Sequence, residues 1–142
     1  MTTVLPDTDE LVRAALAAGL PTANVFTLWP DDWAARLPLV VARRVAGAAP
    51  DPRGLDAALI DVQAAADDRR AAHHLARQAR AVLFDACADQ FMHADADGYL
   101  SHFRGETAGP AEIRDNRPAP GADFFRFQAT YQITARSLPY GG

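Results

Sequence analysis

The 142-residue sequence contains no lysine, so all fourteen of its basic side chains are arginines. Phosphate-loop lysines, Schiff-base lysines and serine–lysine nucleophile pairs all need an amine that this chain lacks. Only two serines are present, Ser101 and Ser137, and neither lies in a Gly-x-Ser-x-Gly elbow. Ser101 precedes His102 in an expected strand, which directs their side chains to opposite faces. We therefore predict no catalytic residues and no enzymatic activity.

The single cysteine, Cys87, excludes an internal disulfide and is consistent with a reducing compartment. Few other side chains could bind a soft metal, namely His73, His74, His93 and His102. His73 and Cys87 are about 21 Å apart along one expected helix, whereas zinc ligands lie ~2 Å from the ion. His93 and His102 flank a turn, but two ligands without a third make a weak site. We predict no metal and no cofactor.

Long apolar runs and an excess of positive charge are also missing. No run approaches the ~18 residues that cross a bilayer, and residues 1–7 lack the basic and apolar regions of a signal peptide. We expect no membrane association and a protein made in the cytoplasm. The net charge of −4 is the opposite of the basic footprint of a dedicated nucleic-acid-binding domain. Length and an apolar fraction of 49% fit one folded domain over residues 1–142.

Two segments have apolar residues at helical spacing. The first covers residues 8–19, with Pro6 before it and Gly19 at its end. The second starts after Asp67 and Asp68, which can cap it, and runs for about 22 residues or roughly 33 Å. A third, much shorter helical turn is expected before Pro38, with Asp31 or Asp32 as its cap.

Strand patterns occupy most of the remaining chain. β-Branched and alternating residues predict strands over residues 39–45 and 55–65, and an Asp-Gly turn at 95–98 leads to another that begins at Tyr99. Residues 48–54 hold two prolines and a glycine and predict a loop, as do the proline-rich residues 115–122.

The last strand has the clearest alternation in the sequence. Its apolar face is formed by Phe125, Phe127, Ala129, Tyr131 and Ile133, and Arg126 begins the polar face. At more than ten residues it exceeds the usual ~5–6, so we expect part of it to pair or pack outside its own domain. The fold class is α+β, a small mixed or antiparallel β-sheet with one long and one shorter α-helix packed on one face.

A basic stripe follows the expected outer face of the long helix, formed by Arg69, His73, Arg77 and Arg80. Two interpretations are open. The stripe is a solvated face, or it docks on an acidic surface of a partner.

The central and final segments together resemble a known family. The strand Leu-Ile-Asp-Val-Gln-Ala-Ala at residues 59–65 is followed by a helix with the core Ala-His-x-Leu-Ala-Arg-x-Ala-Arg-Ala at residues 72–81. A proline-rich loop then precedes an aromatic-to-polar strand at residues 124–136. From Pro38 onward this pattern resembles the tail terminator (tail completion) proteins of long-tailed, siphovirus-type bacteriophages.

The resemblance implies a virion protein of the tail and neck, assembled in the host cytoplasm. Six subunits would form a ring that caps the tail tube at its head-proximal end and binds the head connector or stopper protein. Six copies at −4 each total −24, and this charge would let DNA pass through the lumen without specific binding. The candidate subunit or partner interface comprises Phe125, Phe127, Tyr131, Arg126, Asn116, Arg117, Arg77 and Arg80.

Two other interpretations remain open at this point. One is a different neck protein, a head-completion or stopper component, which shares the virion setting but contacts the portal side. The other is a small α+β ligand-binding or enzymatic dimer with His102 or Tyr99 in a pocket. A deep pocket lined by these two residues would favour it.

Overall fold

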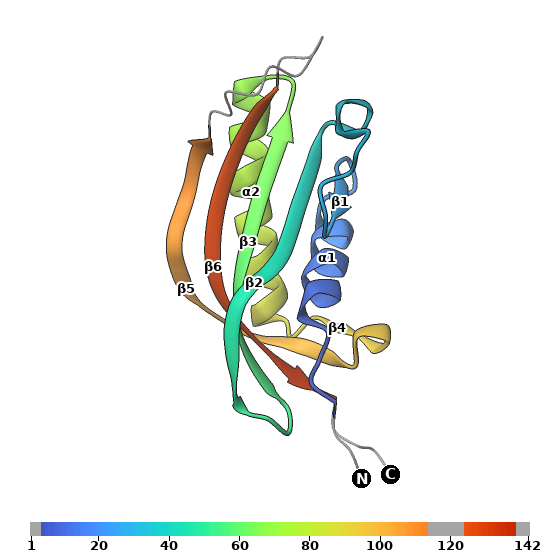
Figure 1. Ribbon diagram of the computed structural model, residues 1–142, viewed down its shortest axis with the longest axis vertical. Helices are drawn as coiled ribbons and strands as arrows, with labels where there is room; N and C mark the ends of the chain where they lie inside the picture. Colours follow the sequence, from blue (N-terminus) through green and yellow to red (C-terminus); the bar gives the residue numbers. More distant parts are fainter. Residues whose placement is uncertain (1–3, 114–123, 139–142) are drawn as a thin grey trace.

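The computed structural model describes residues 4–113 and 124–138 (Figure 1). The predicted proline-rich loop at residues 115–122 lies outside these ranges. The elements follow one another as α1 (Thr8–Gly19), β1 (Asn24–Phe26), η1 (Trp33–Arg36), β2 (Leu39–Asp51), β3 (Leu55–Ala66), α2 (Arg69–Ala88), β4 (Met92–His93), η2 (Ala94–Ala96), β5 (Gly98–Ile113) and β6 (Phe125–Ser137). Among the described residues no helix is both long and apolar enough to cross a membrane.

The strands form one curved sheet in the order β1-β2-β3-β6-β5-β4. β1 and β2 are parallel and all other neighbours are antiparallel, so the sheet is mixed. Both helices pack on the same face, where they share one hydrophobic core with β2, β3, β5 and β6 (Figure 1). The predicted α+β class is confirmed.

The helix α2 forms where capping and apolar spacing predict it. The Asp68 carboxylate accepts a hydrogen bond from the Ala71 backbone amide at 3.1 Å, which satisfies one free N–H of the first turn. The residues at helical spacing are buried against the sheet, namely Ala72, Leu75, Ala76, Ala79, Leu83 and Cys87. At the other end Gln90 has φ 54°, and the amides of Gln90 and Phe91 donate to the carbonyls of Cys87 and Ala86. This is a Schellman cap with glutamine where glycine is favoured.

A buried polar network joins α1 to the sheet. Thr8 donates its hydroxyl to Oδ2 of Asp56 at 2.7 Å, and Asp56 is only 5% exposed. The Arg44 guanidinium donates to both oxygens of the same carboxylate at 3.0 and 3.1 Å. The backbone amide of Arg44 donates to Asp9 at 2.5 Å. The first turn of α1 is therefore fixed to β2 and β3 through buried and half-buried polar contacts.

The predicted loop at residues 48–54 is wrong for most of its length. β2 continues to Asp51, and Ala48 pairs with Ala57 of β3. Only residues 52–54 form the turn. Pro50 is tolerated because it falls in the irregular part of the ladder between Ala48 and Asp51, where no amide donor is required.

The expectation that the last strand pairs outside its domain is also wrong. β6 lies inside the sheet, with β3 along one side, from Leu55 opposite Arg136 to Ala66 opposite Phe125, and β5 along the other. β6 has 13 residues and β3 has 12, so the backbone N–H and C=O groups between these two long strands pair within the chain. The predicted alternation is confirmed, because four of the five residues of the apolar face are buried, namely Phe127, Ala129, Tyr131 and Ile133, and Phe125 is half-buried against the same core.

A second, smaller apolar cluster lies on the sheet face opposite the helices. Leu39, Val41 and Ala65 are buried beneath a group of half-buried side chains, Phe26, Trp29, Trp33, Leu37 and Phe124. The predicted helical turn before Pro38 is η1, which carries Trp33 onto this cluster. Asp32 does not cap it through its side chain and pairs with Arg36 at 3.0 Å instead.

Candidate functional site

The four candidate interface residues on β6 fall into two groups. Phe127 and Tyr131 are 4% and 0% exposed, so their side chains belong to the core of the subunit. Phe125 and Arg126 are half-buried, and the Arg126 guanidinium lies over the Trp29 ring at 5.7 Å. Of these four candidates, only Phe125 and Arg126 reach the surface. The loop candidates Asn116 and Arg117 lie outside the described residues.

The basic stripe predicted on α2 is divided by the structure. Arg69 pairs with Glu112 of β5 at 2.9 Å, and Arg80 pairs with Glu106 of the same strand. The His73 ring stacks near Phe127 with centroids 5.0 Å apart. These three residues lean onto β5 and β6 rather than outward, because their helical positions face the sheet margin. Arg69 and Arg80 are exposed as expected but neutralised by β5, and the half-buried His73 departs from the expected outer stripe. Arg77 is exposed and lies on the stripe as expected.

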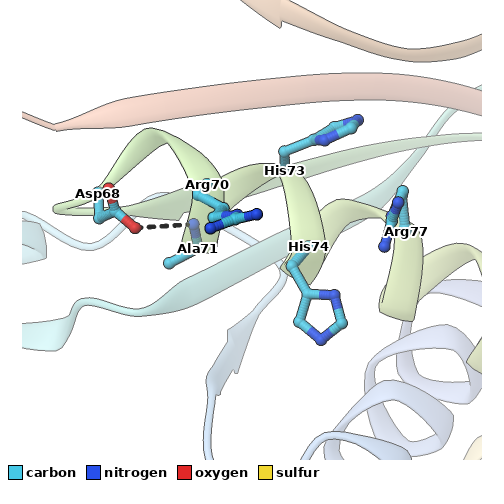
Figure 2. Close-up of a pocket in the computed structure, with 6 residues that line it drawn as sticks. All are labelled: Asp68, Arg70, Ala71, His73, His74 and Arg77. Atoms are coloured by element: carbon cyan, nitrogen blue, oxygen red, sulfur yellow. Dashed lines mark hydrogen bonds between the residues drawn. The ribbon is translucent and has the colours of Figure 1, made fainter.

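Arg77 lies with Arg70, His73 and His74 at an open hollow of about 450 Å³ (Figure 2). The hollow is lined by Asp68, Arg70, Ala71, His73, His74 and Arg77. In Figure 2 the His73 ring turns toward the sheet, whereas His74 points away from it. Asp68, the one carboxylate of this lining, is engaged by the Ala71 amide. The hollow is therefore a cationic surface.

The sequence interpretation missed Arg70 and His74, although the signal was present. Arg70, His74 and Arg77 are spaced by four and three residues, which places them on one helix face. Within the described part of the chain, none of the three has a carboxylate partner within 4 Å. The three side chains are therefore available to an external group.

A second hollow, of about 390 Å³, lies over β5 and β6 and includes Tyr99 and His102. The register shift between Leu100 and His102 brings Ser101 to the same hollow, so the expected opposite orientation of Ser101 and His102 is wrong. The Ser101 hydroxyl donates to the Thr134 carbonyl at 3.1 Å and also contacts the Thr134 hydroxyl at 2.8 Å. These contacts join β5 to β6, and the Ser101 hydroxyl is not paired with a histidine base.

The remaining histidines and the cysteine are separated in the fold. Among residues 4–113 and 124–138, no three histidine, cysteine, aspartate or glutamate side chains are grouped as metal ligands would be. His93 lies 3.6 Å from Glu10, near the first turn of α1. Cys87 is buried, and loss of solvation raises the pKa of its thiol to about 12.

The two margins of the sheet are open along most of their length. On one side, β1 covers β2 only from Leu39 to Val41, and residues 42–51 have no strand neighbour there among the described residues. On the other side, β4 pairs with β5 at Gly98 and Tyr99, and the Leu100 amide donates to the Phe91 carbonyl at 2.9 Å. Residues 101–113 have no strand neighbour on that side among the described residues. The two edges differ, because β5 has four register shifts against β6 and β2 has two against β3. The subunit therefore has two unlike strand edges on opposite sides.

Comparison with known proteins accounts for nearly the whole chain. A model of the phage tail termination protein family matches residues 4–139. No curated protein matches the chain significantly. The match includes both helices and all strands described above, so the chain belongs to the family of phage tail termination proteins.

Proposed function

We propose that this protein forms a ring of identical subunits that caps the tail tube at its head-proximal end and joins it to the head connector. Membership of the family implies a structural component of the virion tail rather than an enzyme. The ring, its six subunits and its contact with the connector are the further steps that we propose here.

The observation that carries the ring is the pair of unlike open edges. A ring closes through one head-to-tail contact repeated around an axis, so each subunit needs two different complementary surfaces. Residues 45–51 of β2, beyond the Arg44 amide that Asp9 of α1 engages, and residues 101–113 of β5 are such surfaces, on opposite sides of one sheet. Pairing of one edge with the other edge of a neighbour would satisfy backbone groups that are otherwise left to water. The half-exposed Phe125 and Arg126 add side chains to the contact surface.

The charge of the chain supports a conduit for DNA. Six copies at −4 each would total −24, and repulsion of phosphate would let DNA pass without binding to the wall. A channel wall dominated by arginine side chains would contradict this part of the proposal.

Cross-linking across the two edges tests the ring. One cysteine replaces Val45 on β2 and another replaces Thr107 on β5, both exposed, in a Cys87→Ala background. A bifunctional thiol reagent that spans about 10 Å, twice the strand spacing, tolerates a register offset of about two residues between the edges. In further variants the second cysteine therefore replaces Arg104 or Ala111, both exposed on β5, in place of Thr107. We expect a ladder of covalent species that ends at the hexamer, whereas each single-cysteine variant stays unlinked. Double-cysteine variants none of which links, or a ladder without an end, would contradict the ring.

Binding to purified tail tubes and to purified heads separates a terminator from another neck protein. We expect the protein at tube ends in electron micrographs and no binding to the portal of tail-less heads that lack their connector. Binding to such heads alone would instead assign it to the head-completion side.

A further inference from the structure

The solvent-exposed face of α2 has an ordered distribution of charge. The exposed side chains along it and at its C-cap include Arg70, His74, Arg77, Phe84, Asp85 and Asp89. The basic residues occupy the first half, the acidic residues the end, and Phe84 is 52% exposed between them. Within the described residues, none of the five charged or titratable members has an ion-pair partner in its own subunit.

This distribution works against the stability of the helix that carries it. Helix dipoles favour acidic residues in the first turn and basic residues in the last, and α2 has neither. Arg70 lies in the first turn, and Asp85 lies in the last. Like groups also stand four residues apart, as with Asp85 and Asp89, and such pairs destabilise a helix. A pattern that opposes the local structure indicates that these charges serve a contact outside the subunit.

The same distribution is complementary to itself when a second helix runs antiparallel. With the two copies centred between Arg80 and Ala81, the 1.5 Å rise per residue places His74 midway along the axis between Asp85 and Asp89 of the second copy, about 3 Å from the level of each. Arg77 then comes opposite the exposed Phe84 ring, as a cation–π contact requires. The long Arg70 side chain reaches the end of the partner helix, where Asp89 lies. In this orientation the two helix dipoles are antiparallel, so the positive end of each helix lies beside the negative end of the other.

We propose that the exposed face of α2 binds the same face of a second copy of this chain, antiparallel, about a two-fold axis. The contact is isologous, so His74 and Arg77 of each copy meet Asp85 and Phe84 of the other. It is independent of the strand edges. In a ring built from head-to-tail contacts, a two-fold contact joins two rings rather than neighbours within one. The proposal therefore predicts a species of twice the mass of the basic unit, whether that unit is a subunit or a ring.

Charge reversal tests this contact by sedimentation velocity at about 50 mM NaCl. One helix face predicts a weak contact, with a dissociation constant of roughly 10 µM, that is lost at about 0.5 M NaCl. The variant Arg70→Glu/Arg77→Glu and the variant Asp85→Arg/Asp89→Arg should each self-associate at least about tenfold more weakly than the wild type. An equimolar mixture of the two should recover the larger species, because every contact then joins opposite charges.

Two further readouts make the test decisive. The variant Asp31→Arg/Asp95→Arg changes the net charge as much as the acid reversal but lies on other exposed surfaces, and it should self-associate like the wild type. Both reversed variants should also melt about 2–4 °C higher, since their charges now agree with the helix dipole. Wild-type protein that never doubles in mass at about 100 µM, ten times the expected dissociation constant, would overturn the proposal. Reversed variants that associate normally, or that fail to recover on mixing, would overturn it as well.

Discussion

Replacing Asp56 with alanine should lower the free energy of unfolding by about 3 kcal/mol. The substitution removes three hydrogen bonds, one from the Thr8 hydroxyl and two from the Arg44 guanidinium. All three bonds have the Asp56 carboxylate as acceptor, and a hydrogen bond to a charged group contributes about 1.5 kcal/mol. The Arg44 side chain is 34% exposed, so water can hydrate it after the substitution. This hydration reduces the total loss of stability to about 3 kcal/mol.

Urea denaturation followed by circular dichroism measures this change. The matched control is Asp51→Ala, which breaks the exposed pair with Arg53 at the tip of the β2–β3 hairpin and should leave stability unchanged. Thr8→Ala and Asp56→Ala should cost less together than the sum of the single changes, because they remove one shared bond. A loss below about 1 kcal/mol for Asp56→Ala would refute the reasoning that this network fixes α1 to the sheet.

Three other predictions concern buried or strained groups. Tyr131→Phe should raise stability by about 1 kcal/mol in urea denaturation, because the buried hydroxyl has no hydrogen-bond partner among the described residues. Burial raises the pKa values of Cys87 and Tyr131 to about 12, so the folded state retains protons that the unfolded state loses. The free energy of unfolding should thus fall as the pH rises from about 9 to about 12. The double variant Cys87→Ala/Tyr131→Phe should have a flatter dependence on pH, and a slope equal to that of the wild type would contradict the assignment of this fall to the two groups. Gln90→Gly should raise the melting temperature by about 2 °C, because glycine adopts the left-handed cap conformation without strain.

The elements that could be predicted from the sequence are those whose signals are local. Asp68 and the apolar stripe from Ala72 to Cys87 specify α2 almost to its ends, since caps and helical spacing act within a few residues. The alternation from Phe127 to Ile133 likewise specifies which face of β6 is buried.

The features that could not be predicted depend on pairing between distant segments. The extension of β2 to Asp51 is decided by its partner β3, and the internal position of β6 is decided by strand order. The sequence of a strand does not reveal which strands flank it. The unusual length of β6 therefore suggests a contact outside the domain, whereas the structure places β3 and β5 on its two sides.

The candidate site illustrates the same division. Helical spacing was sufficient to group Arg70, His74 and Arg77, but only the fold reveals that Glu106 and Glu112 of β5 neutralise Arg80 and Arg69. The register shift next to Ser101 was equally invisible in the sequence, because a bulge depends on the opposing strand.

Growth of the tail tube in the presence of this protein tests the central claim most directly. The tube protein of the same phage is allowed to polymerise, and the terminator is added at a small fraction of its concentration. The account predicts that growth stops at once and that electron micrographs reveal a single ring of this protein at one end of each tube. Tubes that continue to lengthen at the rate seen without the protein, with no additional density at either end, would contradict it.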